Sequence, residues 1–153
     1  MADMGVKNFA VVAETLWRGG RPDAGAAERL ADAGVRTVVN LELLHSDDNA
    51  FWIPGATGIK LERIRGWEPD VVVAPWLALR HVNRFLAMVR DTNGTVYVHC
   101  RDGQNRTGLM VAAYRMVYQG WAAWDAIFEM QSFKGAWASQ NRDFILGHGH
   151  RFK

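Results

Sequence analysis

One ten-residue stretch of the chain combines a thiol, a guanidinium and two glycines at a spacing that suits phosphate chemistry. It reads His99-Cys100-Arg101-Asp102-Gly103-Gln104-Asn105-Arg106-Thr107-Gly108. The segment from Cys100 to Arg106 can curl until its backbone N–H groups point inward, and a concave array of such groups binds anions. Gly103 and Gly108 can supply backbone conformations that residues with a Cβ avoid. The stretch therefore predicts a phosphate-binding loop with a nucleophile at its first position.

The residue types within this loop suit distinct chemical roles. The Arg106 guanidinium can hold two phosphate oxygens in a planar fork, and a helix that begins near it adds free N–H donors and partial positive charge. Such surroundings favour a thiolate, so we expect Cys100 to be ionised at neutral pH and to attack phosphorus. Thr107 is expected to donate its hydroxyl to the sulfur, and His99 to support the loop from behind. The remaining loop positions are expected to surround the phosphate: Arg101, Asp102, Gly103, Gln104 and Asn105.

A lone cysteine is more often a buried structural residue than a nucleophile, because a free thiol packs like a small hydrophobic group. Cys100 is the only cysteine, so an internal disulfide and a cysteine-rich metal site are excluded within these residues. The structural role is disfavoured here, because an apolar run at 95–98 leads into the cysteine and a helix-like run at 109–118 leads out of it. Strand, loop and helix in this order can hold a tetrahedral dianion against a nucleophile.

The leaving oxygen needs a proton donor, and the segment Trp67-Glu68-Pro69-Asp70 is the natural place to look for one. It lies between an expected strand and an expected helix, about thirty residues before Cys100. A carboxyl group held over the pocket can protonate the leaving oxygen and then deprotonate water. Asp70 is the preferred proton donor, and its competing role is to cap the next helix. Glu68 and then Asp102 are the alternatives.

At these residues the chain resembles the cysteine-dependent protein tyrosine phosphatase superfamily, whose pattern is Cys, five residues, Arg and then Ser or Thr. Segments 8–12, 16–22 and 34–41 resemble the entry segment and first core strand of small bacterial and fungal dual-specificity phosphatases, and the resemblance covers nearly the whole chain. It implies a compact α/β domain and phosphomonoester hydrolysis through a phosphocysteine, with no cofactor and no metal. It also implies a general acid on a mobile loop, although Glu68 interrupts the usual Trp-Pro-Asp order of the larger tyrosine phosphatases.

Three functions of different classes remain open. The first is a phosphatase of phosphorylated protein, acting on phosphotyrosine and also on phosphoserine or phosphothreonine. The second keeps the reaction but takes a small phosphorylated substrate, such as an inositol phosphate, a lipid headgroup or a nucleotide. A highly charged ligand of this kind needs several cations, whereas Asp102 offsets Arg101 within the loop. The third is an inactive phosphate-binding module, which the complete set of Cys100, Arg106 and Thr107 disfavours.

Length and composition predict one phosphatase domain over 1–153, with 1–7 and 148–153 as frayed ends. About half of the residues are hydrophobic, which argues against disorder, and the formal net charge of +2 is too small to indicate nucleic acid as a partner. No run of about eighteen apolar residues indicates a membrane span, and residues 1–7 lack an apolar signal core. We therefore expect a cytoplasmic protein, or a periplasmic one if a leader has been removed.

The elements that must position the loop alternate between strand and helix, which is typical of a single α/β domain with a central, mostly parallel sheet flanked by helices. Apolar runs and alternation predict strands at 16–18, on the sheet edge, and at 37–41, 59–64 and 95–99. Apolar residues at helical spacing predict helices at 24–33, 75–89, 107–119, 124–130 and about 140–146. Asp23 and Gly34 fit the start and stop of the first helix. The phosphate loop would then lie beyond the carboxyl end of a central strand, where open α/β sheets bind ligands.

Four further charged residues are predicted to lie outside the catalytic set. Asp47 and Asp48 belong to a long polar loop, 45–58, and are expected to be solvated charges. Arg18 and Arg21 fit a supporting role at the phosphate pocket, but they fit ordinary surface or structural pairing at least as well.

Overall fold

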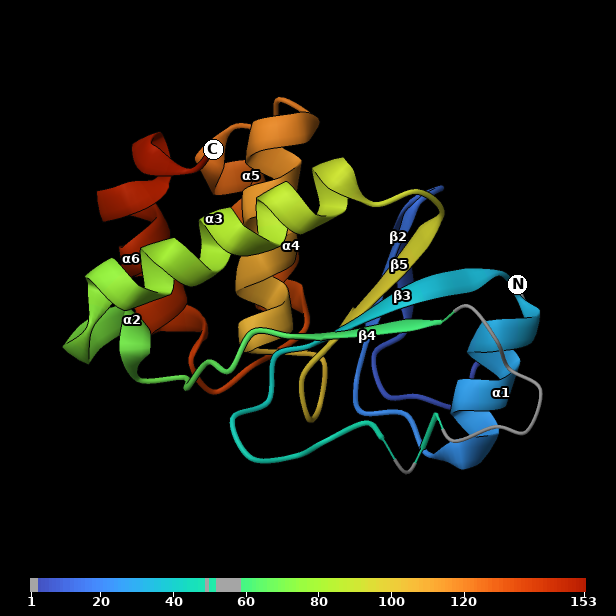
Figure 1. Cartoon of the computed structure of the whole chain (residues 1–153). Helices are drawn as coiled ribbons and strands as arrows, with labels where there is room; N and C mark the ends of the chain where they lie inside the picture. Colours follow the sequence, from blue (N-terminus) through green and yellow to red (C-terminus); the bar gives the residue numbers. More distant parts are fainter. Residues whose placement is uncertain (1–2, 49, 52–58) are drawn as a thin grey trace.

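A five-stranded sheet forms the centre of the molecule, and helices cover both of its faces (Figure 1). The computed structural model describes residues 3–48, 50–51 and 59–153. The strands are β1 (Ala10–Ala13), β2 (Leu16–Gly19), β3 (Val35–Asn40), β4 (Lys60–Arg63) and β5 (Thr95–His99). The helices are α1 (Ala24–Asp32), α2 (Asp70–Val73), α3 (Pro75–Asp91), α4 (Arg106–Tyr118), α5 (Ala123–Ser132), α6 (Ala138–His148) and the final 3₁₀ turn η1 (Gly149–Arg151). The expected α/β class with a mostly parallel sheet is confirmed.

The strand order β1-β2-β5-β3-β4 places β5 in the middle of the sheet. Strands β2, β5, β3 and β4 run parallel, and β1 runs antiparallel to β2. The last residue of β5, His99, lies beside Gly19 of β2 and Asn40 of β3. The carboxyl ends of three parallel strands therefore meet at one edge of the sheet, and the segments that follow them form the edge at which open α/β sheets bind ligands.

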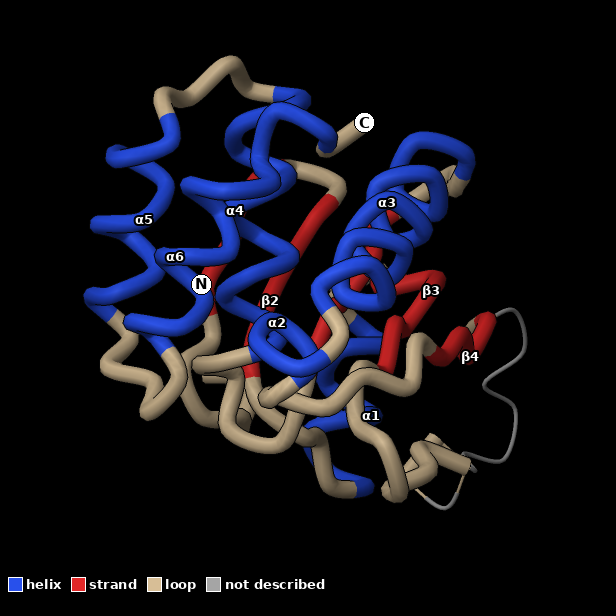
Figure 2. The backbone as a smooth tube through the Cα atoms, turned by 90° about the vertical axis from the view of Figure 1, so that its left-hand side faces the viewer, coloured by secondary structure: helices blue, strands red, loops and turns tan. Residues whose placement is uncertain are grey.

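Side chains of β5 alternate between the two faces of the sheet and so contribute to two hydrophobic cores. Val96 and Val98 face helices α2 to α6, where they join a cluster that includes Leu109. Tyr97 faces the opposite side, where α1 packs on β3 and contributes Leu30. Figure 2 looks onto the layer formed by α2 to α6, with the sheet behind it. Because both faces are covered, the strand that leads to Cys100 reads as a continuous apolar run.

The boundaries of α1 agree with their sequence signals. Asp23 Oδ1 accepts a hydrogen bond from the N–H of Ala26 at 2.8 Å, as an N-cap residue does. Gly34 follows the helix with a φ of +108°, in the region that favours glycine. These local contacts fix α1 in the crossover from β2 to β3.

Three parts of the fold differ from the expectations. Strand β2 lies inside the sheet and not at its edge, because β1, which is not among the predicted strands, pairs with it and occupies the edge. A single helical turn, α2, precedes α3. The end 148–153 is not frayed, because the chain continues from α6 into η1 and the buried Phe152 packs against Phe144 with ring centroids 6.0 Å apart. Met4, near the start of the described chain, is likewise buried.

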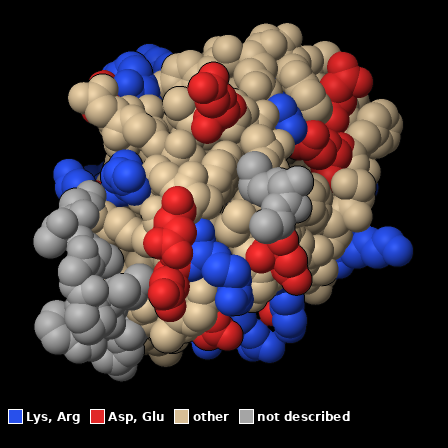
Figure 3. Space-filling view, turned by 90° about the vertical axis from the view of Figure 1, so that its right-hand side faces the viewer, with Lys and Arg blue, Asp and Glu red and all other residues tan. Residues whose placement is uncertain are grey.

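The length of the helices and the distribution of charge on one face bear on membrane and nucleic acid binding. Among the described residues, no helix is long and apolar enough to cross a lipid bilayer. On the face that carries α1 and β4, acidic and basic side chains are interspersed and do not gather by sign (Figure 3). In its described part, this face therefore lacks the extended basic area that a nucleic acid backbone requires.

Candidate active site

The residues 100–106 form a tight loop between the end of β5 and the start of α4. The loop turns at Gly103, whose φ of +73° lies in the left-handed region. A Cβ at this position would lie 2.5 Å from the carbonyl carbon of Gly19, so only glycine permits the close approach to the end of β2. The spacing of the glycine within the motif therefore follows from the contact between the loop and the neighbouring strand.

Four carbonyl oxygens of the loop are bound by donors outside it. Arg21 N donates to Arg101 O at 2.9 Å, Asn8 Nδ2 to Asp102 O at 2.8 Å, Arg18 Nη2 to Gly103 O at 2.8 Å and Asn141 Nδ2 to Asn105 O at 3.1 Å. In a trans peptide the carbonyl and the N–H of the next residue point in opposite directions, and the described chain contains no cis peptide bond. The N–H groups that follow these carbonyls therefore point to the inside of the loop, where they form a concave array of donors.

The Cys100 thiol lies at the base of this loop. It is 3% exposed and borders an open pocket of about 630 Å³. The buried hydroxyl of Thr107 donates to Cys100 Sγ at 3.1 Å. A hydroxyl donor stabilises negative charge on the sulfur, and the first turn of α4 adds the positive end of its helix dipole. The positive end of the helix dipole, the Thr107 hydroxyl donor and the open pocket therefore all lie next to the sulfur atom of Cys100.

A second guanidinium, that of Arg18, lies beneath the loop. It is fully buried, it donates to Gly103 O, and its Cζ lies 3.7 Å from the centroid of the Phe133 ring. Burial lowers the pKa of Arg18 to about 10, while Glu129 and Cys100 act in the opposite direction. Arg18 therefore remains protonated at neutral pH. Of the two roles that the sequence leaves open for Arg18, the structure shows support of the loop.

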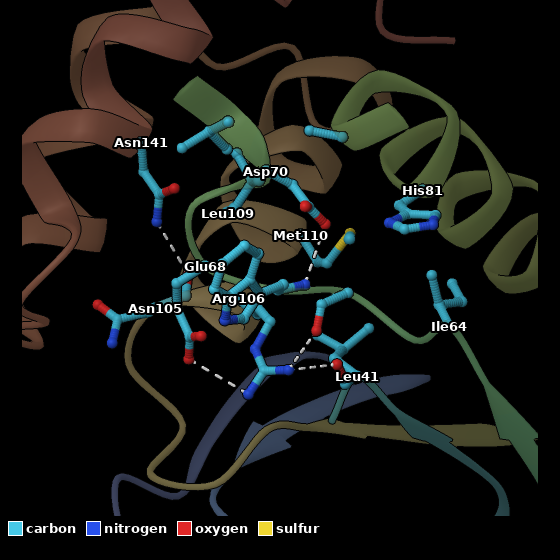
Figure 4. Close-up of a pocket in the computed structure, with 14 residues that line it drawn as sticks. Leu41, Ile64, Glu68, Asp70, His81, Asn105, Arg106, Leu109, Met110 and Asn141 are labelled. Atoms are coloured by element: carbon cyan, nitrogen blue, oxygen red, sulfur yellow. Dashed lines mark hydrogen bonds and ion pairs between the residues drawn. The ribbon is translucent and has the colours of Figure 1, made fainter. Parts of the chain in front are cut away.

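The guanidinium of Arg106 is bound on two sides (Figure 4). Its Nη1 donates to the carbonyl oxygens of Leu41 and Gly66 at 2.7 and 2.6 Å, in the segments that follow β3 and β4. Its Nη2 pairs with Glu68 Oε1 at 3.2 Å. Its Nε is buried and makes no hydrogen bond within the described residues. The Nη1 bonds fix the guanidinium plane, so that Nε and Nη2 form the edge that a phosphate would meet, with Glu68 occupying part of it.

Glu68 and Asp70, the two candidate proton donors near Arg106, border different cavities. Glu68 borders the pocket that contains Cys100, whereas Asp70 borders a neighbouring cavity of about 30 Å³, which has room for roughly one water. Asp70 Oδ2 accepts a hydrogen bond from Trp67 N at 3.0 Å, which holds the carboxylate within its own turn. His81 borders the same cavity (Figure 4), and burial lowers its pKa, with a smaller opposing effect of Asp70. The role of Asp70 as proton donor stays a prediction.

Arg101 and Asp102 lie at the rim of the pocket that contains Cys100. The Arg101 side chain is 73% exposed, and its Nε lies 3.8 Å from Asp102 Oδ2. On its other side Asp102 faces Lys7 Nζ at 3.5 Å. Both acidic and basic groups are therefore present at the rim, and they offset each other.

Gln104 and Asn105 hold the loop through their side chains. Gln104 Nε2 donates to the carbonyl of Phe133 at 2.8 Å, and Asn105 Oδ1 accepts from Trp137 N at 2.9 Å. Asn141 reaches the same region from α6, through its bond to the carbonyl of Asn105. These contacts tie the loop to the segments before and within α6 and leave its backbone N–H groups for a ligand.

His99 lies behind the loop, and its partner differs from what the sequence indicates. Its Nδ1 lies 3.1 Å from the carbonyl oxygen of Cys100, and its Nε2 lies 2.6 Å from Asp47 Oδ2. The expectation that Asp47 is a solvated charge is wrong, because this residue is only 4% exposed. The segment 41–48 brings it against the end of β5, while the adjacent Asp48 is exposed as expected.

Arg21, whose side chain is 39% exposed, forms an ion pair with the buried Glu42. Its Nε lies 3.1 and 3.0 Å from the two carboxylate oxygens of Glu42, and its Nη2 also bonds to this group. The hydrogen bond to Glu42 raises the pKa of Arg21. Glu42 is a supporting residue that the sequence analysis does not single out. Its only signal is an acidic residue placed two positions after a buried strand, which does not by itself distinguish a buried residue from an exposed one.

The sequence of the chain matches a known protein family and curated proteins. Residues 4–144 match the family model described as "DSP-PTPase phosphatase fused to NAD+ Kinase". The chain is 33% identical over 124 residues to the dual specificity protein phosphatase TpbA of Pseudomonas aeruginosa (strain UCBPP-PA14), and this match covers 81% of the chain and 53% of TpbA. The chain thus spans about half the length of the curated relatives that it matches.

Solved structures share the fold. The crystal structure of P. aeruginosa TpbA has a TM-score of 0.76 at 27% identity and covers 96% of this chain and 88% of that one. A cysteine-to-serine variant of TpbA in complex with pTyr has a TM-score of 0.72 at 26% identity, with coverages of 96% and 93%. The core catalytic domain of the PP-IP phosphatase SIW14 from S. cerevisiae, at 21% identity and a TM-score of 0.73 with coverages of 92% and 85%, shares the fold alone. The chain therefore belongs to the dual-specificity and protein tyrosine phosphatase family of cysteine phosphatases.

Proposed function

We propose that the chain hydrolyses phosphomonoesters through a phosphocysteine at Cys100, as a protein tyrosine or dual-specificity phosphatase. The observation that carries this proposal is the 3.1 Å contact of Thr107 Oγ1 with Cys100 Sγ at the base of the loop. A structural cysteine needs neither a hydroxyl donor nor backbone N–H groups that point to the inside of the loop. A thiolate that attacks phosphorus and later leaves it benefits from both.

The proposed reaction has two steps. In the first, the Cys100 thiolate attacks phosphorus, an S–P bond forms, the P–O bond to the leaving group breaks, and a carboxylic acid gives its proton to the leaving oxygen. In the second, the same carboxylate takes a proton from water, the hydroxide attacks phosphorus, and the S–P bond breaks with its electron pair returning to sulfur. Thr107 stabilises the sulfur as it leaves. The loop amides and Arg106 hold the other phosphate oxygens throughout.

The pocket around Cys100 favours a phosphorylated protein over a small polyanion. Its charged lining residues are balanced in sign, with Arg21, Arg101 and Arg106 against Glu42, Glu68 and Asp102. Much of the remaining lining is apolar or aromatic: Leu43, Leu44, Trp67, Ala136 and Trp137. The ring of a phosphotyrosine can pack against such a rim, whereas an inositol polyphosphate needs an excess of cations. The complex of the TpbA variant with pTyr supports the same substrate class.

A substrate panel with trapping of the intermediate tests this function. We expect hydrolysis of an aryl phosphate and of a phosphotyrosine peptide in the presence of a metal chelator, slower hydrolysis of a phosphothreonine peptide, and the least with an inositol polyphosphate. Acid quenching during turnover should leave phosphate on Cys100, which mass spectrometry detects. Efficient turnover of the inositol polyphosphate alone would overturn the phosphoprotein assignment, and loss of all turnover with the chelator would overturn the mechanism.

The variants Asp70→Asn and Glu68→Gln separate two candidates for the proton donor. We expect Asp70→Asn to lower kcat for a phosphotyrosine peptide by about a hundredfold, because a general acid contributes at least this much. Glu68→Gln should instead lower KM, because the carboxylate that occupies Arg106 Nη2 no longer competes with phosphate. Steady-state kinetics with both variants measure the two effects.

The choice of leaving group supplies the control for these variants. A substrate whose leaving group is a weak base needs little protonation, so Asp70→Asn should turn it over at nearly the wild-type rate. In the structure Asp70 lies outside the pocket of Cys100, and it can act only if the segment 67–70 moves. A hundredfold loss in Glu68→Gln with none in Asp70→Asn would transfer the role to Glu68.

A further inference from the structure

A buried chain of polar groups runs from Asp47 through the ring of His99 to the backbone of Cys100. We infer that Asp47 is a positioning residue: its carboxylate keeps His99 as a doubly protonated imidazolium behind the phosphate loop, and this charge favours the thiolate of Cys100. The consequence for catalysis rests on the proposed function. The protonation of His99 and the reactivity of the thiol can be measured without any substrate.

Both ring nitrogens of His99 face oxygen acceptors. The carbonyl oxygen of Cys100, 3.1 Å from Nδ1, can only accept, so Nδ1 must carry a hydrogen. The carboxylate of Asp47, 2.6 Å from Nε2, also only accepts while it is ionised, so Nε2 must carry a hydrogen as well. A ring with hydrogens on both nitrogens is positively charged. A neutral ring beside an ionised Asp47 would place a lone pair against one of the two oxygens.

On this inference the proton of the 2.6 Å contact lies on the ring and not on the carboxylate. An imidazole binds a proton more tightly than a carboxylate does in water. A second acidic group acts in the same direction, because Glu42 Oε2 lies 3.9 Å from His99 Nδ1. Glu42 is paired with Arg21, which offsets part of its negative potential, so Asp47 is the main acidic group at the ring.

Asp47 has His99 as its cationic partner. The carboxylate is buried, and its Oδ1 makes no hydrogen bond within the described residues. The residues outside the description, 1–2, 49 and 52–58, contain no ionisable side chain. A buried carboxylate is stable only when it is paired with a cation or satisfied by hydrogen bonds. The ion pair with His99 therefore accounts for the burial of Asp47 in an otherwise polar loop.

Among the described residues, the other groups that contact His99 carry no charge. Tyr97 stacks on its ring with centroids 5.8 Å apart, and burial raises the pKa of this phenol, so it is neutral. Gly19 on β2 and Asn40 on β3 flank His99 in the sheet. The ring therefore faces Asp47 at Nε2, and it faces the carbonyl oxygen of Cys100 and, farther away, Glu42 at Nδ1. Its charge joins those of Arg18 and Arg106 around the phosphate loop.

The variant Asp47→Asn tests the charge with little change of shape. Asparagine can donate to Nε2 while Nδ1–H still donates to the carbonyl of Cys100, so the hydrogen bonds persist and the ring becomes neutral. Because Cys100 is the only cysteine, the rate of iodoacetamide labelling as a function of pH reports its thiolate. We expect the midpoint of this profile to rise by about half to one pH unit, and the acid limb of kcat/KM to move in the same direction. The exposed neighbour variant Asp48→Asn is the matched control and should overlay the wild type.

Nitrogen NMR of the wild-type chain with labelled histidine gives a reading that does not depend on the folding of a variant. We expect both nitrogens of His99 to be protonated at neutral pH, and only one in Asp47→Asn. A neutral His99 ring in the wild type, or a folded Asp47→Asn variant with an unmoved labelling profile, would overturn the inference. If both signatures are present but no substrate is hydrolysed, the inference on Asp47 holds and the proposed function is wrong.

Discussion

The variant Cys100→Ser is expected to turn over an aryl phosphate at least about a thousandfold more slowly than the wild-type chain. A serine hydroxyl is not ionised at neutral pH, so the loop no longer holds a nucleophile comparable with a thiolate. The Thr107 hydroxyl can still donate to the serine oxygen, and the four loop carbonyls keep their outside donors. Binding of a phosphotyrosine peptide should therefore be nearly preserved. Steady-state kinetics and calorimetric titration measure the two quantities.

Preserved binding is also the control for Cys100→Ser, because a misfolded variant would lose binding and turnover together. The covalent mechanism predicts in addition that no phosphate is trapped on the quenched variant. Turnover within about tenfold of the wild type would contradict a sulfur nucleophile.

Arg106→Lys is expected to lower kcat/KM by about 100- to 1000-fold, the effect of removing one strong donor from a transition state. An ammonium group keeps the charge but cannot bind the carbonyls of Leu41 and Gly66 and still present a two-nitrogen edge to phosphate. Gly66 is buried, and within the described residues Arg106 is the donor to its carbonyl, so loss of this bond should also lower the free energy of unfolding by about 1–3 kcal/mol. Kinetics and denaturant titration measure these losses separately.

Arg101→Lys is the matched control for the Arg106 variant. Arg101 borders the same pocket, but its side chain is largely exposed and has one distant ionic partner in Asp102. We expect its kcat/KM to stay within about fivefold of the wild type. A similar loss in both variants would mean that the net charge of the pocket, and not the fork of Arg106, drives catalysis.

The parts of the fold that the sequence predicts well depend on local signals. The run 95–99 is apolar because both of its faces are covered, and Asp23 and Gly34 act through contacts within a few residues. Strand β1 has four residues, all of them apolar, and it lies at the sheet edge with Val11 exposed, so it is too short to show the alternation of a half-buried strand. The burial of Phe152 depends on helices that meet only in the folded chain. Elements of this kind need the tertiary arrangement before they can be identified.

The candidate site divides in the same way. The phosphate loop is contiguous, so residue types and spacing suffice to predict which groups surround the pocket. Its supporting residues come from distant segments, with Arg18 on β2 and Asp47 after β3. Their burial depends on a strand order that places β2 and β3 on either side of β5. Without this pairing an aspartate in a polar loop is expected to be solvated, which is why the sequence alone predicts an exposed Asp47.

With the proposed thiolate at Cys100, the absence of a second cysteine in these 153 residues makes the chain vulnerable to peroxide. A reactive thiolate is converted by peroxide to sulfenic acid, and many proteins then protect the sulfur by forming a disulfide with a neighbouring thiol. The 153 residues offer Cys100 no such neighbour. Recovery must therefore come from a reductant supplied by the surroundings, and oxidation beyond sulfenic acid would be permanent. The working lifetime of the molecule is thus tied to the redox state of its compartment.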